Sequence, residues 1–147
     1  MAEVSKSVLV EYTPAQMFDL VDRCEDYPQF LPWCGGAEVI ERTDERTVAT
    51  IHVNYHGIRT HFTTENAKQA PGEMHLRLRE GPFRHLDGGW YFRPLGDVAC
   101  KVEFRLRYEF EHKLLEKALG PVFNHIANTF VDSFVKRAGQ IYARGAA

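Results

Sequence analysis

The chain has 147 residues, of which 44% are hydrophobic and 26% are charged, and its formal net charge is −2. This profile indicates one globular domain, residues 1–147, with a core adequate without disulfides, and it excludes disordered, collagen-like and coiled-coil chains. Residues 1–45 hold ten acidic and three basic side chains, whereas residues 46–110 hold seven acidic and ten basic ones, so strong non-specific nucleic-acid binding is not implied.

The sequence contains no apolar run of about 18 residues and no secretory signal. Cys24, Cys34 and Cys100 form neither a C-x-x-C pair nor an even-numbered framework, so we expect buried thiols in a reducing compartment. We therefore expect a cytoplasmic protein, with peripheral contact to an inner membrane left open.

The first 30 residues predict a strand followed by a helix. Residues 4–12 alternate between apolar and polar side chains, as in a half-buried strand. Thr13-Pro14-Ala15-Gln16 then forms a capping box with proline at the first helical position. The helix is expected to bury Met17, Leu20, Val21 and Cys24, to expose Asp19, Asp22 and Asp26, and to end at Tyr27-Pro28.

The middle of the chain predicts a mostly antiparallel sheet with one buried face. Strand-like runs separated by turn signals cover residues 37–42, 47–55, 59–66, 74–80, 84–92 and 100–110. The last run is the clearest, because apolar residues alternate with charged ones from Cys100 to Phe110.

The last third predicts one long amphipathic helix. Apolar residues recur every three or four positions from Leu115 to Ile141, and Gly120-Pro121 interrupts them. We therefore expect a kink or a restart at Pro121, with the main helix over residues 121–143. The sheet and the helix must each bury an apolar face, which predicts an α+β fold with the helix across the sheet.

No phosphate-binding, nucleophile-elbow or zinc-protease motif occurs. His52, His56 and His61 are interpreted as exposed side chains, and Asp87 and Glu80 as solvated carboxylates. We therefore assign no catalytic residue, no metal ligand and no required cofactor, and expect a protein that is not an enzyme.

Three segments resemble the signatures of a known family. Residues 27–34, YPQFLPWC, resemble Y-P-x-F-[LV]-P-x-C; residues 81–86, GPFRHL, followed by Trp90 and Phe92, resemble G-P-F-[KR]-x-L with W-x-F; and residues 134–138, FVKRA, resemble A-F-x-x-R-A, with Ser133 in place of the first alanine. The chain is thus similar to the RatA-type ribosome-association toxins and the mitochondrial coenzyme-Q-binding proteins, in the polyketide-cyclase-like branch of the START superfamily.

This resemblance implies a helix-grip fold, with a curved antiparallel sheet of about six or seven strands around a long C-terminal helix. It also implies two different functions. One is non-catalytic binding of a hydrophobic lipid, ubiquinone, in support of respiratory electron transfer. The alternative is a toxin of a type II toxin–antitoxin pair, which binds the large ribosomal subunit, blocks subunit association and inhibits translation.

The residue pattern favours an apolar cavity between the sheet and the helix, although the same side chains could form a plain core. The loops at residues 30–36 and 81–83 are either plugs of that core or a gate to the cavity. The expected lining is Trp33, Phe62, Leu76, Phe83, Trp90, Phe104, Leu106, Phe123, Ile126 and Phe130.

Basic residues are expected on the outer face of the sheet, mainly Arg77, Arg79, Arg105 and Arg107. This face could meet RNA phosphates or anionic lipid headgroups, or it could be an ordinary solvated exterior. The ribosome interpretation ranks second, because the acidic first 45 residues should repel RNA unless they face away.

Overall fold

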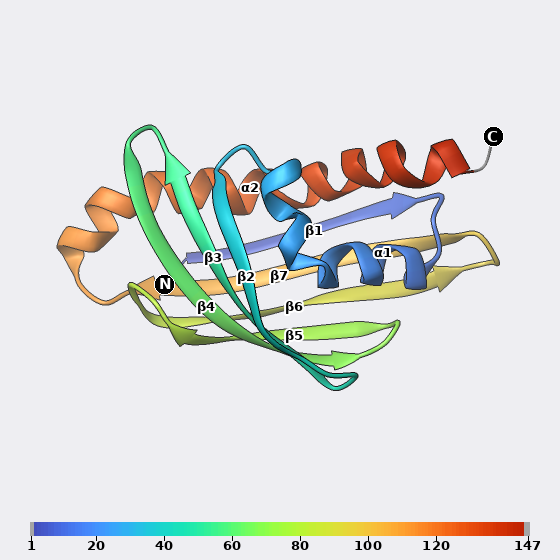
Figure 1. Cartoon of the computed structure of the whole chain (residues 1–147), viewed down its shortest axis with the longest axis horizontal. Helices are drawn as coiled ribbons and strands as arrows, with labels where there is room; N and C mark the ends of the chain where they lie inside the picture. Colours follow the sequence, from blue (N-terminus) through green and yellow to red (C-terminus); the bar gives the residue numbers. More distant parts are fainter. Residues whose placement is uncertain (1, 146–147) are drawn as a thin grey trace.

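The structure is a computed structural model that describes residues 2–145 (Figure 1). Seven strands form one antiparallel sheet in the order β1-β7-β6-β5-β4-β3-β2, and a long helix lies along it. This arrangement confirms the expected helix-grip fold. The strands are β1 (Ala2–Val10), β2 (Cys34–Arg42), β3 (Arg46–Tyr55), β4 (Ile58–Gln69), β5 (Glu73–Glu80), β6 (Phe83–Leu95) and β7 (Ala99–Phe110).

The chain crosses from one edge of the sheet to the other between β1 and β2, through helix α1 (Pro14–Asp22) and the 3-10 helix η1 (Cys24–Gln29). The capping box is confirmed, since Thr13 and Gln16 bond to each other's backbone amides. The prediction that the helix runs to Tyr27-Pro28 is wrong. The α-helix ends at Asp22, because the backbone of Arg23 leaves the helical region, and Pro28 lies inside η1.

Inner and outer faces of the strands follow the predicted alternation except on β3, where residues 47–51 are all buried. On β7 the side chains of Cys100, Val102, Phe104 and Tyr108 are buried, and the exposed Arg105 and Arg107 lie on the other face. Register shifts occur within the β2–β3, β4–β5 and β6–β7 pairs. Such bulges bend strands, so they suit a sheet that curves around a helix.

The C-terminal helix α2 (Lys113–Gly145) is continuous, with Pro121 inside it. Of the two alternatives at Pro121, the break with a restart of the helix is therefore wrong. Proline removes one backbone donor, but Pro121 lies on the exposed side, and the buried residues Leu119 and Val122 on either side of it belong to one apolar stripe. The stripe is buried as far as Ala138, whereas Ile141 is 41% exposed.

Aromatic rings from four parts of the chain meet under α2. The ring centroid of Trp90 lies 4.6 Å from that of Phe104 and 5.2 Å from that of Phe134, and the Phe130 and Phe134 centroids are 5.0 Å apart. Tyr27 joins them through an edge contact with Phe134 at 5.3 Å. This cluster joins η1, the sheet and α2 in one core, and it forms one side of the cavity described next.

Candidate functional site

A cavity of about 80 Å³ lies between the inner face of the sheet and α2. Nine of the ten residues predicted to line it do so: Trp33, Phe62, Leu76, Trp90, Phe104, Leu106, Phe123, Ile126 and Phe130. The other lining residues are Val21, Cys24, Tyr27, Ala49, Ile51, Thr64, Asn66, Met74, Leu86 and Ala127. Val21, Cys24 and Tyr27 come from the segment of α1 and η1 that joins β1 to β2, here called the α1–η1 connection. None of these three residues was predicted to line a site.

Phe83 does not line the cavity, so this assignment is corrected. It begins β6 instead of lying in a loop, and its ring packs against Phe62, Phe110 and Phe123 with centroids 6.2, 5.0 and 4.9 Å away. These contacts hold it in the core beside the cavity. Of the two interpretations of residues 81–83, a plug of the core is therefore correct for Phe83.

Two polar residues of the lining, Thr64 and Asn66, were missed by the sequence analysis. Both are buried on β4, and the Thr64 hydroxyl donates to Asn66 Oδ1 at 2.9 Å. The signal for them was present, because positions 62, 64 and 66 share one face of a strand. Polar side chains at strand positions that face inward indicate a polar contact inside the protein, since a buried polar group needs a hydrogen-bond partner.

The cavity is electrically neutral, because none of the side chains that line it is a formal cation or carboxylate. Burial raises the pKa of the Cys24 thiol to about 12 and raises the pKa of the Tyr27 phenol well above its ordinary value. The Tyr27 hydroxyl donates to the backbone carbonyl of Val21. Both groups are therefore uncharged at neutral pH, and the site suits a neutral, apolar guest.

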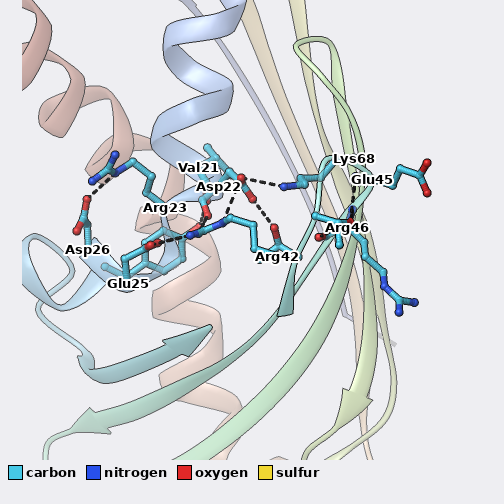
Figure 2. A network of polar contacts seen from close by, with 12 residues as sticks. Val21, Asp22, Arg23, Glu25, Asp26, Arg42, Glu45, Arg46 and Lys68 are labelled. Atoms are coloured by element: carbon cyan, nitrogen blue, oxygen red, sulfur yellow. Dashed lines mark hydrogen bonds and ion pairs between the residues drawn. The ribbon is translucent and has the colours of Figure 1, made fainter. Parts of the chain in front are cut away.

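A polar network attaches the α1–η1 connection to the sheet (Figure 2). Asp22, predicted to be exposed, instead accepts from Thr47 Oγ1 at 2.7 Å and pairs with Lys68 at 3.1 Å. The Lys68 side chain is only 6% exposed. Arg42 donates to both carboxylate oxygens of Glu25 at 2.8 Å, and this hydrogen bonding lowers the pKa of Glu25 to about 2.

On its other side, the same connection is attached to α2. Arg137 Nη2 donates to Gln29 Oε1 at 2.8 Å, and the guanidinium lies over the Phe30 ring at 5.3 Å. Arg137 comes from the FVKRA segment, and Gln29 and Phe30 come from YPQFLPWC. Two of the sequence signatures therefore meet beside the cavity, and they fasten the connection that covers it.

The four outer arginines, Arg77, Arg79, Arg105 and Arg107, are exposed as expected, but each has a carboxylate nearby. Arg77 and Arg79 lie 2.7 and 4.0 Å from Glu65. Arg105 lies 3.6 Å from Glu103, and Arg107 lies 3.6 Å from Asp87. The outer face is therefore a row of ion pairs, within β7 for Arg105 and between neighbouring strands for the other three arginines, more than a free cationic surface.

One part of this face is hollowed. The β5–β6 ladder ends at Arg77 and Asp87, although both strands continue toward the turn between them. A surface hollow of about 330 Å³ lies there, lined by Arg77, Leu78, Arg84, His85, Leu86, Asp87 and Arg107. Three of its seven lining residues are arginines, and two of these come from the predicted basic surface.

Among the described side chains, those of residues 2–142, no group of three or more His, Cys, Asp or Glu is placed to hold a metal ion. His52 and His61 lie near Glu38 and Glu80 as separate pairs, at 3.2 and 3.9 Å. Over the same residues, no helix has the length and apolar character needed to span a membrane. Cys24, Cys34 and Cys100 are buried and unpaired.

The fold and its cavity define a helix-grip protein with an apolar site between sheet and helix. The family described as "Polyketide cyclase / dehydrase and lipid transport" matches residues 10–135, and the chain belongs to this family. It is 43% identical to the ribosome association toxin RatA of Vibrio cholerae over 97% of this chain and 99% of that one. It is 41% identical to RatA of Escherichia coli over 97% and 90%.

A more distant relative is the mitochondrial coenzyme Q-binding protein COQ10 homolog B of Xenopus laevis, 26% identical over 97% of this chain and 60% of that one. The resemblance seen in the sequence is thereby confirmed. Among solved structures, an 18 kDa protein of Caulobacter crescentus is 30% identical, with a TM-score of 0.73 over 97% and 99% of the two chains. The Zhui aromatase/cyclase of Streptomyces is similar in fold, with a TM-score of 0.81 over 93% of each chain at 14% identity.

Proposed function

We propose that this chain binds a neutral hydrophobic molecule, ubiquinone, in the cavity between the sheet and α2, without catalysing a reaction on it. The observation that carries the proposal is the lining, which combines aromatic and aliphatic side chains with the polar side chains of Thr64 and Asn66 and holds no charge. The name of the Xenopus relative states coenzyme Q binding for that protein. Through bound quinone, the chain would support respiratory electron transfer.

The size of the cavity sets a condition on this function. Its volume is about 80 Å³, whereas pockets for drug-sized ligands usually span about 300–1,000 Å³. A quinone ring therefore needs side chains or the α1–η1 connection to move outward. Because Cys24, Tyr27 and Trp33 come from this connection and the segment after it, its displacement would enlarge the cavity directly.

Filling the cavity tests the proposal. Phe130→Trp adds volume to the lining from α2, and we expect quinone affinity to fall because the guest and the larger ring compete for the same space. Phe18→Trp is the matched control, since Phe18 is buried against Phe92 and does not line the cavity. Isothermal titration calorimetry with a short-chain ubiquinone measures both variants. Equal affinities in two folded variants would contradict this site, and no binding to the parent chain would contradict the function.

A second candidate function is association with the large ribosomal subunit, with inhibition of subunit joining. The observation that favours it is the name of the relatives at 41–43% identity, which are called ribosome association toxins. The surface proposed for this role is the outer arginine face. The arginine-lined hollow at the end of the β5–β6 ladder is its most concentrated part. The carboxylates beside these arginines compete with RNA phosphates, which argues for moderate and salt-sensitive binding.

Gradient sedimentation with large subunits at low salt tests this second function. A quadruple variant reverses the charge of this face and should no longer co-migrate with the large subunit: Arg77→Glu, Arg79→Glu, Arg105→Glu and Arg107→Glu. In single variants, each RNA phosphate that is no longer neutralised should reduce the logarithmic salt slope by about 0.7–0.9. The matched control carries the same charge change on other exposed residues: Arg59→Glu, Lys113→Glu, Lys117→Glu and Lys136→Glu. An equal effect in both quadruple variants would contradict the arginine face, and no co-migration of the parent chain would contradict ribosome association.

A further inference from the structure

Trp33 carries a hydrogen-bond donor that the protein leaves unused. Its side chain lines the cavity and is only 2% exposed. Among the side chains of residues 2–142, just two buried polar atoms lack a partner, and Trp33 Nε1 is one of them. Buried polar groups in folded proteins are nearly always paired, and a buried indole N–H usually finds an acceptor. An exception in a residue that lines a cavity therefore points to an acceptor that is not part of the chain.

The two hydroxyl groups of the lining already have partners within the protein. The Tyr27 hydroxyl donates to the Val21 carbonyl, and the Thr64 hydroxyl donates to Asn66. Trp90, the second indole of the lining, has no buried atom left unpaired. The Phe130 ring packs against Trp33 with centroids 6.0 Å apart, and this ring carries no lone-pair acceptor. Trp33 thus differs from these neighbouring polar groups.

We propose, resting on the ligand-binding function above, that the Trp33 indole N–H donates a hydrogen bond to a neutral carbonyl oxygen of the bound molecule. The acceptor must be neutral, because the lining holds no cation to pair with a carboxylate and a buried unpaired charge is costly. Trp33 therefore selects quinones and other uncharged carbonyl-bearing lipids over fatty-acid anions. It also selects them over plain hydrocarbons, which offer the N–H nothing to bond with.

A pair of matched substitutions tests this role. Trp33→Phe removes the buried, unpaired donor, and Trp90→Phe makes the same chemical change at the second indole of the same cavity, whose nitrogen is not among the buried unpaired atoms. The ligands are a ubiquinone with one isoprenoid unit and the corresponding prenylated benzene, which lacks all oxygens. Calorimetry should show that Trp33→Phe weakens quinone binding by about two- to tenfold relative to its effect on the hydrocarbon, as expected for one neutral hydrogen bond. Trp90→Phe should weaken binding of both ligands alike.

The possible results test the Trp33 hydrogen bond and the cavity-binding function separately. If Trp33→Phe weakens both ligands equally, the hydrogen bond is wrong and cavity binding stands. If the parent chain binds neither ligand, the proposed function itself is wrong. Should Trp33→Phe fail to fold, the indole proton resonance of Trp33 in the parent chain replaces it. That resonance should move downfield with the quinone and not with the hydrocarbon, and an equal response to both contradicts the hydrogen bond.

Discussion

The two faces of the sheet are built from the same strands, but different forces determine them. The inner face packs aromatic rings against α2, and Trp90, Phe104 and Phe134 are almost completely buried there. The outer face pairs arginines with carboxylates from neighbouring strands, at distances up to 4.0 Å. The comparison shows that rows of arginine on a strand do not by themselves make a cationic surface. The inner face therefore contributes more to the free energy of folding, because burial of apolar surface stabilises a protein more than exposed ion pairs do.

The sharpest test of this contrast is a truncation in the aromatic cluster. Phe134→Ala should lower the free energy of unfolding by about 3–5 kcal/mol, because it removes a ring that contacts Tyr27, Phe30, Trp90 and Phe130. Ile40→Ala is the control at a 62% exposed position and should change it by no more than about 0.5 kcal/mol. Urea denaturation measures both. A decrease below about 1 kcal/mol for Phe134→Ala would break the comparison.

The second test compares a buried ion pair with an exposed one. Lys68→Met leaves Asp22 without its main partner in a poorly hydrated place and should destabilise the protein by about 2–3 kcal/mol, somewhat less than for a fully buried pair. Arg77→Met removes a 76% exposed partner of Glu65 and should cost about 0–1 kcal/mol. Equal destabilisation in the two denaturation curves would mean that burial does not determine the strength of these pairs.

The smallest expected effect depends on pH. Hydrogen bonds from Arg42 lower the pKa of Glu25 from 4.5 to about 2, so the folded state favours the ionised carboxylate. This contribution is complete above pH 4.5 and disappears as the pH falls toward 2. Glu25→Gln should therefore be less stable than the parent by about 0.5–1 kcal/mol at about pH 7, since solvent screens this half-exposed pair.

Thermal unfolding at a series of pH values checks this prediction. The gap between Glu25→Gln and the parent should close between pH 4.5 and about 2, the interval between the two pKa values of Glu25. A gap that is constant over this range would indicate that the substitution acts through packing, whatever the charge of Glu25.

The fold could be predicted largely from local periodicity, because strands and helices that bury one face show it in their residue spacing. Alternation on β7 and the apolar stripe of α2 were sufficient for the architecture. Five lining residues followed from strand parity and three from the stripe of α2. Phe83 was misplaced because a loop-like Gly-Pro-Phe sequence hides the start of β6. The break at Pro121 was wrong because tertiary packing outweighs one missing backbone bond.

The remaining features depend on contacts between residues distant in sequence. Strand register brings Arg77 to Glu65, and the position where α1 ends brings Asp22 to Lys68. The periodicity of the sequence specifies neither contact. The unpaired Nε1 of Trp33 is likewise invisible in the sequence, because a tryptophan looks the same there whether or not an acceptor lies beside it. Thr64 and Asn66 are the exception, since the parity of β4 already placed them inward.

The placement of the indoles gives the protein a built-in optical reporter. The chain contains two tryptophans, Trp33 and Trp90, and both line the cavity with 2% and 1% of their surface exposed. All tryptophan fluorescence of this protein therefore arises at one site. A quinone within the cavity would quench it by accepting an electron from the excited rings, whereas a molecule bound to the outer arginines would leave both indoles shielded behind the sheet. Occupancy of the cavity can thus be followed in the unlabelled chain, separately from any event on the opposite face.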